Sequence, residues 1–368
     1  MRRIAAQYLF TGQGPMLRHG VVTLDDTGRV TAVEQLAGTE ICSTEFHNGI
    51  LTPGFVNAHC HLELSHFRGL IAPQQGMAHF IEALKDWSRH TVSNAQNIYA
   101  AMKQADDNMY AEGIVAVGDI CNSSHSLGLK TDSRIYYHSF VEAVGLADML
   151  APEKMAETEK VLTEALQARL PASVTPHAYY SMSPALFAYA VAAACTSGML
   201  SIHNQESAGE GSEGLHRILQ VLKANTRLLL VHNTYTTAAD IEVVNQVTTQ
   251  AVWVLCPNSN LHITSSLPPA DVLYKKDVKV ALGTDSLASN MQLSVLEEIK
   301  TLSQHFPEIP LEVLLKWATS GGAAALNKAA DFGTIAPGRK PGLVLIEGVD
   351  FTNMKLLPTA RARAIGEL

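Results

Sequence analysis

Short apolar runs alternate with longer helical patterns over residues 50–330, and this alternation constrains the fold more than any other feature of the sequence. Strands that alternate with helices predict βαβ units and a parallel sheet. The predicted strands are 50–59, 113–120, 135–144, 172–180, 199–204, 227–233, 251–257 and 278–285. The helical patterns between them are 94–112, 150–169, 184–197, 213–224, 237–247 and 292–305. Eight such units fit an α/β protein with a (β/α)8 TIM barrel of ~250 residues, and a doubly wound open sheet is the main alternative.

The two ends of the chain have a different pattern. Near the N-terminus, two runs of β-forming residues flank Asp26-Thr27-Gly28, a typical hairpin turn. Residues 332–348 contain two more short apolar runs, separated by Pro-Gly pairs. Each piece alone is too short to form a stable sheet. We therefore expect residues 1–48 and 332–368 to form one small β-sandwich domain beside a barrel of residues 49–331.

Composition and charge exclude several classes of protein. Hydrophobic residues make up 47% of the chain and charged residues 17%, which supplies a core and excludes a disordered chain. The net charge is −8 and no window is strongly basic, so we expect no nucleic-acid partner. No apolar run approaches the ~20 residues of a membrane span. The five cysteines are scattered without a CxxC motif, and with no signal peptide they predict a cytoplasmic protein.

Polar residues cluster where the predicted strands end. In a parallel barrel the carboxyl ends of all strands open on one face, and that face holds the active site. Residues of metal-binding or acid–base type stand at five of these ends: His59 and His61, His177, His203, His232, and Asp285. The sequence therefore predicts a site where these side chains meet.

The pair His59 and His61 suggests a metal site. Side chains two apart share one face of a strand, so both imidazoles can bind one ion while Cys60 points away. His203 and Asp285 complete a ligand set that suits Zn²⁺ or Fe²⁺ and leaves one position open for water. The alternatives are two ordinary loop histidines and, for Asp285, a helix N-cap, since a helix-like stretch follows it.

Three further residues are candidates for chemistry or binding. Glu206 lies three residues after His203, and a partly desolvated carboxyl there would have a raised pKa and could donate and accept a proton. The alternative is a solvated glutamate in a polar loop. His232 is a further metal ligand, a general base, or a core histidine. His177 is a candidate substrate contact, and the alternative is a core histidine.

With these residues in this order, the sequence resembles the deaminase and chlorohydrolase branch of the amidohydrolase superfamily. The resemblance covers nearly the whole chain and is carried by GILTPGFVNAHCHLE, TPHAYYSMSP, SIHNQES, LLVHNTY, CPNSNLHI and LGTDSLASNMQLSVLEEI. The ordered set HxH, HxxE, His and TDS is specific to this family. The resemblance also includes the split β domain.

The resemblance implies a role for each candidate. His59, His61, His203 and Asp285 match the metal ligands, and Glu206 matches the proton shuttle. His232, with Asp285, would act on the attacking water. His177 matches a ribose contact of nucleoside-deaminating relatives. Trp87 and Glu82, which follow the first strand, are the candidates for the tryptophan and acidic residues that hold substrate in those relatives.

The implied activity is hydrolysis of a carbon–nitrogen bond other than a peptide bond. The expected reaction is deamination of an aminated heterocycle such as an adenine-type nucleoside, with a metal-bound hydroxide as the nucleophile. Related two-metal enzymes use a carbamylated lysine, and no predicted strand here ends in lysine, so we expect one divalent metal, zinc or iron. The alternatives are an amidohydrolase or chlorohydrolase of another cyclic substrate and a non-catalytic binding barrel. A homodimer would be ordinary for this family.

Overall fold

The computed structural model describes residues 1–36, 44–90 and 95–366, without the side chains of residues 87–90. Its centre is a set of parallel strands that confirms all eight predicted runs. One four-stranded sheet contains β6 (Phe55–Cys60), β7 (Ile114–Cys121), β8 (Tyr136–Ala143) and β9 (Ala172–Pro176). The other contains β10 (Met199–Asn204), β11 (Arg227–His232), β12 (Ala251–Leu255) and β13 (Val280–Leu282). Most of these residues are buried, as expected for a parallel sheet covered on both faces.

The outer strands of the two sheets are joined at their carboxyl ends. After β13, the backbone N–H groups of Thr284 and Asp285 both donate to the carbonyl oxygen of His59, at 3.0 and 3.1 Å. Between β9 and β10, the N–H of His203 donates to the carbonyl oxygen of His177 at 2.9 Å. Both joins involve residues that the sequence placed in the candidate site.

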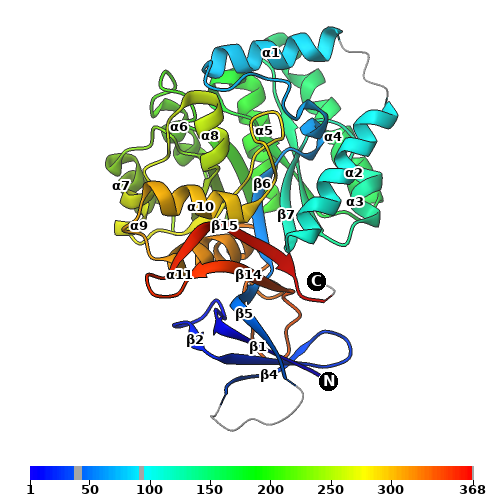
Figure 1. Cartoon of the computed structure of the whole chain (residues 1–368). Helices are drawn as coiled ribbons and strands as arrows, with labels where there is room; N and C mark the ends of the chain where they lie inside the picture. The colour runs from blue at the N-terminus through cyan, green and yellow to red at the C-terminus, as the bar shows by residue number, and fades with distance from the viewer. Residues whose placement is uncertain (37–43, 91–94, 367–368) are drawn as a thin grey trace.

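Helices lie outside the strands, and all six predicted helical segments are confirmed (Figure 1). The helices are α1 (Met77–His90), α2 (Ala95–Ala111), α3 (Leu127–Asp132), α4 (Ala151–Gln167), α5 (Pro184–Ser197), α6 (Glu213–Val221), α7 (Ala238–Val247), α8 (Pro257–Thr264), α9 (Ala270–Lys275), α10 (Val295–His305), α11 (Leu311–Lys316) and α12 (Gly322–Ala325). Short 3₁₀ turns occur at η1 (Leu62–Phe67), η2 (Asp148–Leu150) and η3 (Tyr179–Ser181), and a π turn at η4 (Trp317–Gly321).

Local sequence explains where several helices begin and end. Helix α5 starts with Pro184 after Ser183, whose hydroxyl accepts from the Leu186 N–H, and it ends at Gly198 in the left-handed conformation. Helix α7 starts with a capping box in which Thr237 and Asp240 bond each other's backbone N–H.

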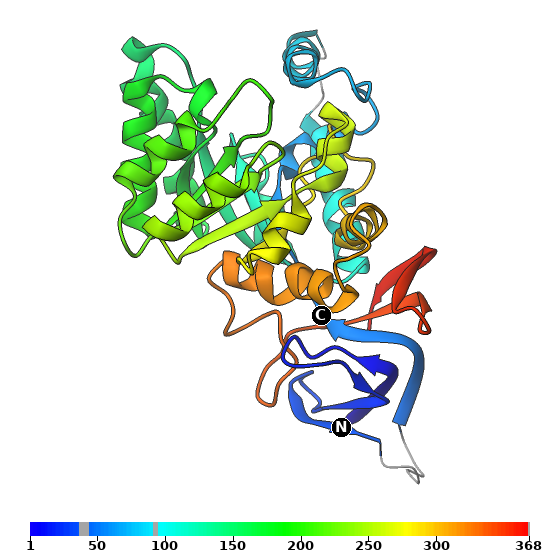
Figure 2. The ribbon, with the colours of Figure 1, turned by 90° about the vertical axis from the view of Figure 1, so that its left-hand side faces the viewer.

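Both ends of the chain contribute to one further sheet, as predicted. Its strands are β1 (Arg2–Leu9), β2 (Leu17–Arg18), β3 (Gly20–Leu24), β4 (Val30–Gln35), β5 (Thr44–Pro53), β14 (Leu343–Asp350) and β15 (Lys355–Ala364), in the order β15-β14-β5-β1-β3-β4 with β2 on β1. The predicted turn joins β3 to β4, and Gly28 in it has a φ of 80°. The sheet lies at the opposite end of the molecule from α1 (Figures 1 and 2).

Three predicted strands are wrong in their extent. The run 172–180 is a strand only to Pro176, since residues 179–181 form η3, and the run 278–285 is a strand only over residues 280–282. The run 50–59 is divided at Gly54, because its first residues extend β5 and pair with β14, while β6 starts at Phe55. A side chain at position 54 would collide with Val115, and its Cβ would lie 2.8 Å from the carbonyl oxygen of Pro341. The chain can pass from one sheet to the other at this point because glycine has no side chain.

The structure also bears on two predictions from composition. Within the described residues, no helix is long and apolar enough to span a membrane. Four cysteines, at positions 60, 121, 195 and 256, are buried and free. The fifth, Cys42, lies outside the described residues.

Candidate metal centre and active site

The predicted ligands come from three different strands and meet at the carboxyl ends of these strands. His59 lies in β6 and His61 directly after it, His203 lies in β10, and Asp285 follows β13. All four are buried. Asp285 has a φ of 55°, in the left-handed region that residues other than glycine rarely adopt. Backbone of this kind occurs often at functional sites.

The ligand atoms of these residues converge on one point. His61 Nε2 lies 3.2 Å from His59 Nε2 and 3.3 Å from His203 Nε2. Asp285 Oδ1 lies 3.5 Å from His61 Nε2 and 3.7 Å from His59 Nε2. Three imidazole nitrogens and one carboxylate oxygen form a donor set that suits Zn²⁺ or Fe²⁺. The residues therefore fit a divalent metal ion.

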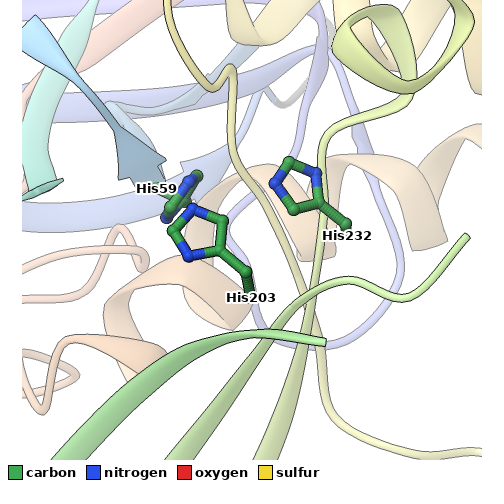
Figure 3. A group of neighbouring side chains, drawn as sticks. All are labelled: His59, His203 and His232. Carbon is green, nitrogen blue, oxygen red and sulfur yellow. The ribbon is translucent and has the colours of Figure 1, made fainter. Parts of the chain in front are cut away.

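His232 belongs to the same cluster of imidazoles. The rings of His59, His203 and His232 face one space (Figure 3), and their ligand atoms lie within 4.8 Å of one another. His232 ends β11, and its φ of 72° turns it out of the strand. The side chain of Asn233 stabilises this turn by donating to the carbonyl oxygens of Leu230 and Val254, at 2.7 and 3.2 Å.

Neighbouring groups orient the ligands. His203 Nδ1 lies 2.9 Å from the carbonyl oxygen of His177, which can only accept, so the ring carries its proton on Nδ1 and turns an Nε2 lone pair into the cluster. Asp285 Oδ2 accepts from Ser259 Oγ at 2.5 Å and from Ser289 Oγ at 2.7 Å. These bonds leave Oδ1 facing the imidazoles.

Burial keeps most of the imidazoles neutral. It lowers the pKa of His59 and of His232 to about 4, and holds the pKa of His61 well below its usual range. Burial also opposes protonation of His203, but the charges of Glu206 and Glu142 outweigh it and raise its pKa.

The carboxyl of Asp285 responds in the opposite way. Burial alone would raise its pKa, but the neighbouring imidazoles of His59, His61 and His232 hold it well below its ordinary value. An ionised carboxylate among neutral imidazoles is the arrangement that a bound cation requires.

Glu206 lies beside the cluster, as predicted. Its Oε1 accepts a hydrogen bond from the Tyr180 hydroxyl, and its Oε2 lies 3.5 Å from His232 Nε2. The backbone N–H of Glu206 donates to Glu210 Oε2 at 3.0 Å. Burial and the charge of Glu206 raise the pKa of Glu210 to about 7. Glu213, the third glutamate of this segment, is exposed on α6.

A cavity of about 550 Å³ opens above these residues. One side is polar and contains His61, His203, Asp285 and Glu206. The other side is apolar and includes Met77, Phe80, Ile81 and Leu84 of α1. Such a combination of apolar surface and a few convergent polar groups is typical of a small-molecule site.

The structure brings together seven of the nine residues that the sequence predicted, namely His59, His61, His177, His203, Glu206, His232 and Asp285. His177 lines the cavity, and its Nδ1 lies 2.6 Å from Ser181 Oγ. Glu82 is exposed on α1 and does not line this cavity. The side chain of Trp87 lies outside the described residues.

Sequence reasoning missed several residues of the site. Glu142 and Tyr180 line the cavity, and Ser259 and Ser289 bond Asp285. Glu142 could have been found, because it is an acidic residue near the carboxyl end of a predicted strand. Both serines lie in segments that carried the family resemblance, but nothing in the sequence pairs them with Asp285.

The parallel α/β fold and this cluster of imidazoles and carboxylate define a hydrolase with a candidate metal centre. The chain belongs to the amidohydrolase family, whose model matches residues 50–364. It is 27% identical over 365 residues to a 5-methylthioadenosine/S-adenosylhomocysteine deaminase of Halobacterium salinarum, covering 92% of this chain and 82% of the relative.

Two solved structures have the same fold. The aminofutalosine deaminase of Helicobacter pylori, in complex with methylthio-coformycin, has a TM-score of 0.80 at 20% identity and covers 96% of this chain and 94% of that one. The atrazine chlorohydrolase of Arthrobacter aurescens, complexed with zinc, has a TM-score of 0.78 at 18% identity and covers 98% and 93%.

Proposed function

We propose that the protein is a metal-dependent deaminase that removes the exocyclic amine of an adenine-type nucleoside or a related aminated heterocycle. The observation that carries the proposal is the adjacency of two groups. The candidate ligands converge on one point, and the Glu206–His232 pair lies directly beside them. The relative from Halobacterium salinarum, whose name states this kind of reaction on adenosine derivatives, supports the same conclusion.

The candidate metal ion would be held by His59, His61, His203 and Asp285. Zinc is the preferred ion, since the related chlorohydrolase is complexed with zinc, and iron is the alternative. When bound, such an ion lowers the pKa of water from 15.7 to about 7, which supplies hydroxide at neutral pH. One ion is proposed, because the ligand set contains no bridging lysine.

Glu206 would move the protons of the reaction. Its Oε2 faces the cavity beside His232, where it can protonate the ring nitrogen next to the aminated carbon and then the departing ammonia. The Tyr180 hydroxyl, which bonds Oε1, would hold the carboxylate in this orientation.

His232 would orient the attacking water rather than bind the metal. Asn260 Nδ2 lies 3.3 Å from His232 Nδ1, and an amide N–H that donates to this nitrogen would place the ring proton on Nε2. An Nε2 that carries a proton has no lone pair for a metal. We also propose that His177, which lines the same cavity, contacts the sugar of the substrate.

We further propose that the two parallel sheets close into a (β/α)8 barrel, with residues 49–331 in the barrel and residues 1–48 and 332–368 in a small β-sandwich domain. The hydrogen bonds between His59 and Thr284–Asp285 and between His177 and His203 support closure at both seams. A cytoplasmic location and a homodimer stay predictions.

A second candidate function is hydrolysis of a carbon–chlorine bond or an amide of another cyclic substrate. The specific observation in its favour is the likeness in fold to the atrazine chlorohydrolase. The same water-activating centre could serve this reaction, because fold does not decide the substrate.

The test is a screen for ammonia release from adenine-type nucleosides and aminated heterocycles by zinc-loaded protein, with metal-stripped protein as the control. We expect ammonia from at least one nucleoside and none without metal. Chloride from a chlorinated triazine, without ammonia from any nucleoside, would instead support the second candidate.

A further inference from the structure

Glu142 is a buried carboxylate in the cavity wall that the proposed reaction does not use. It is the last residue but one of β8, and its side chain is 4% exposed. It lines the same cavity as His177, His203 and Glu206. Its place near the carboxyl end of a strand puts it on the face of the fold that holds the candidate metal ligands.

Only one of its two carboxylate oxygens has a partner. Oε2 accepts a hydrogen bond from Asn122 Nδ2 at 2.8 Å. Oε1 is buried and has no hydrogen-bond partner among the described residues. A buried carboxylate oxygen without a partner is energetically costly, and such groups are rare in folded proteins. The side chain that carries this oxygen lines the cavity of about 550 Å³.

The nearest candidate donor does not satisfy Oε1. His203 Nδ1 lies 3.8 Å away, and its proton is already donated to the carbonyl oxygen of His177 at 2.9 Å. Among the described residues that line the cavity, Lys85 of α1 is the one lysine or arginine, and no ion pair joins it to Glu142. The described residues therefore supply no partner for Oε1, and a molecule in the cavity could supply one.

We propose that Glu142 is a specificity-determining residue that accepts, through Oε1, a hydrogen bond from a hydroxyl or ammonium group of the substrate outside its aminated base. The inference deepens the proposed deaminase function and rests on it. Glu142 and Glu206 both line this side of the cavity, which favours a donor group next to Oε1 and disfavours an anion. The substrate class is then an adenine-type compound with such a donor on its sugar or on the substituent of the sugar.

Two matched pairs of compounds test the proposal in the zinc-loaded enzyme. Adenosine and 2′,3′-dideoxyadenosine differ in the hydroxyl donors, and S-adenosylhomocysteine and its desamino analogue differ in the ammonium group. We expect the wild type to prefer the donor-bearing member of one pair by roughly 10- to 100-fold in kcat/KM, the effect of one hydrogen bond to a charged group. The pair that shows the preference identifies the donor.

Substitutions at Glu142 then connect the preference to this residue. In Glu142→Gln, Asn122 would retain the amide oxygen, and the amide NH₂ would replace Oε1, which removes the acceptor. We expect the ratio of kcat/KM between the donor-bearing compound and its counterpart to fall to about one in Glu142→Gln and Glu142→Ala. Glu157→Gln, at an exposed position of α4, is the matched control and should keep the preference.

Binding of the deaminated products provides a readout without catalysis. Calorimetry should show that wild type binds the donor-bearing product more tightly than its counterpart, and that the Glu142 variants do not distinguish them. The proposal is overturned if wild type has the same kcat/KM for both members of each pair. It is also overturned if the Glu142 variants lose kcat/KM equally for both members, or if the protein binds a second metal ion per chain. If no compound releases ammonia but product binding still depends on Glu142, the deaminase function fails and the role of Glu142 in recognition stands.

Discussion

Asn57 of β6 and Thr284, which follows β13, exchange two hydrogen bonds across 227 positions of the sequence. Asn57 Nδ2 donates to Thr284 Oγ1 at 2.7 Å, and the Thr284 N–H donates to Asn57 Oδ1 at 3.1 Å. Both side chains are fully buried. His59 lies two residues after Asn57, and Asp285 directly follows Thr284, so this pair determines how far the two candidate ligands lie from each other.

Asn57→Ala should therefore weaken both the fold and the metal site. It removes both buried hydrogen bonds of the pair, which costs about 1–3 kcal/mol of unfolding free energy, although the Thr284 N–H keeps its bond to the carbonyl oxygen of His59. Urea denaturation with and without zinc measures the effect, and the stabilisation by zinc should also shrink. Thr284→Ser keeps the hydroxyl and serves as the control. Unchanged stability in Asn57→Ala would contradict the role of the pair.

Asp285→Asn should impair metal binding without unfolding the protein. The amide retains the shape of the carboxylate but lacks the charge that balances a cation. Since loss of a group that merely supports a ligand costs about 10–100-fold in metal affinity, loss of a ligand should cost at least as much. Competition with a chelator measures zinc affinity, and His125→Ala, at an exposed histidine outside the cluster, is the control. Wild-type zinc affinity in Asp285→Asn would rule out its role as a ligand.

Glu206→Gln should retain the metal and lose turnover by about 10²–10⁴-fold, the usual contribution of a positioned proton donor and acceptor. Ammonia release and metal content, measured on the same preparation, separate these two properties. The exposed Glu213→Gln on α6 is the matched control. Near-normal turnover of Glu206→Gln would falsify the shuttle role.

Tyr180→Phe should lower kcat more than it changes KM. The substitution removes the hydroxyl that bonds Glu206 Oε1, and loss of one hydrogen bond to a charged group is expected to reduce kcat roughly 10-fold. Tyr179→Phe is a close control, because the Tyr179 hydroxyl bonds the exposed Glu213 instead, at 3.1 Å. A change in KM alone would show that Tyr180 binds substrate rather than orients Glu206.

Glu298→Gln should make stability less dependent on pH. Glu298 is buried in α10 and accepts from the Asn258 N–H and from Asn290 Nδ2, and burial raises its pKa from 4.5 to about 8. Because the folded state then binds this proton more tightly than the unfolded state, the unfolding free energy should fall by up to about 1.4 kcal/mol per pH unit as the pH rises from 4.5 to about 8.

Urea denaturation at several pH values over this range measures the slope. Glutamine removes the titration, so the curve should flatten in Glu298→Gln and keep its slope in the exposed control Glu308→Gln. Identical slopes in Glu298→Gln and wild type would show that Glu298 does not titrate in this range.

Much of the molecule follows from local pattern. The spacing of the apolar residues predicted the eight strands and the main helices. A helix or strand that buries one or both of its faces needs apolar residues at regular positions in the sequence. The candidate ligands followed from the same pattern, since parallel strands bring their carboxyl ends together however far apart they lie in the chain. Residue type then indicated a metal, because imidazole and carboxylate are ligands for zinc and iron.

Other features depend on distances that no local pattern contains. The partner of Glu206 is Tyr180, 26 positions away. The unpaired oxygen of Glu142 can be identified only when the positions of the neighbouring hydrogen-bond donors are known. The division of the run 50–59 at Gly54 depends on the approach of Val115 of β7 and of Pro341, which precedes β14. These features arise from packing between segments that are remote in sequence, so only the tertiary structure decides them.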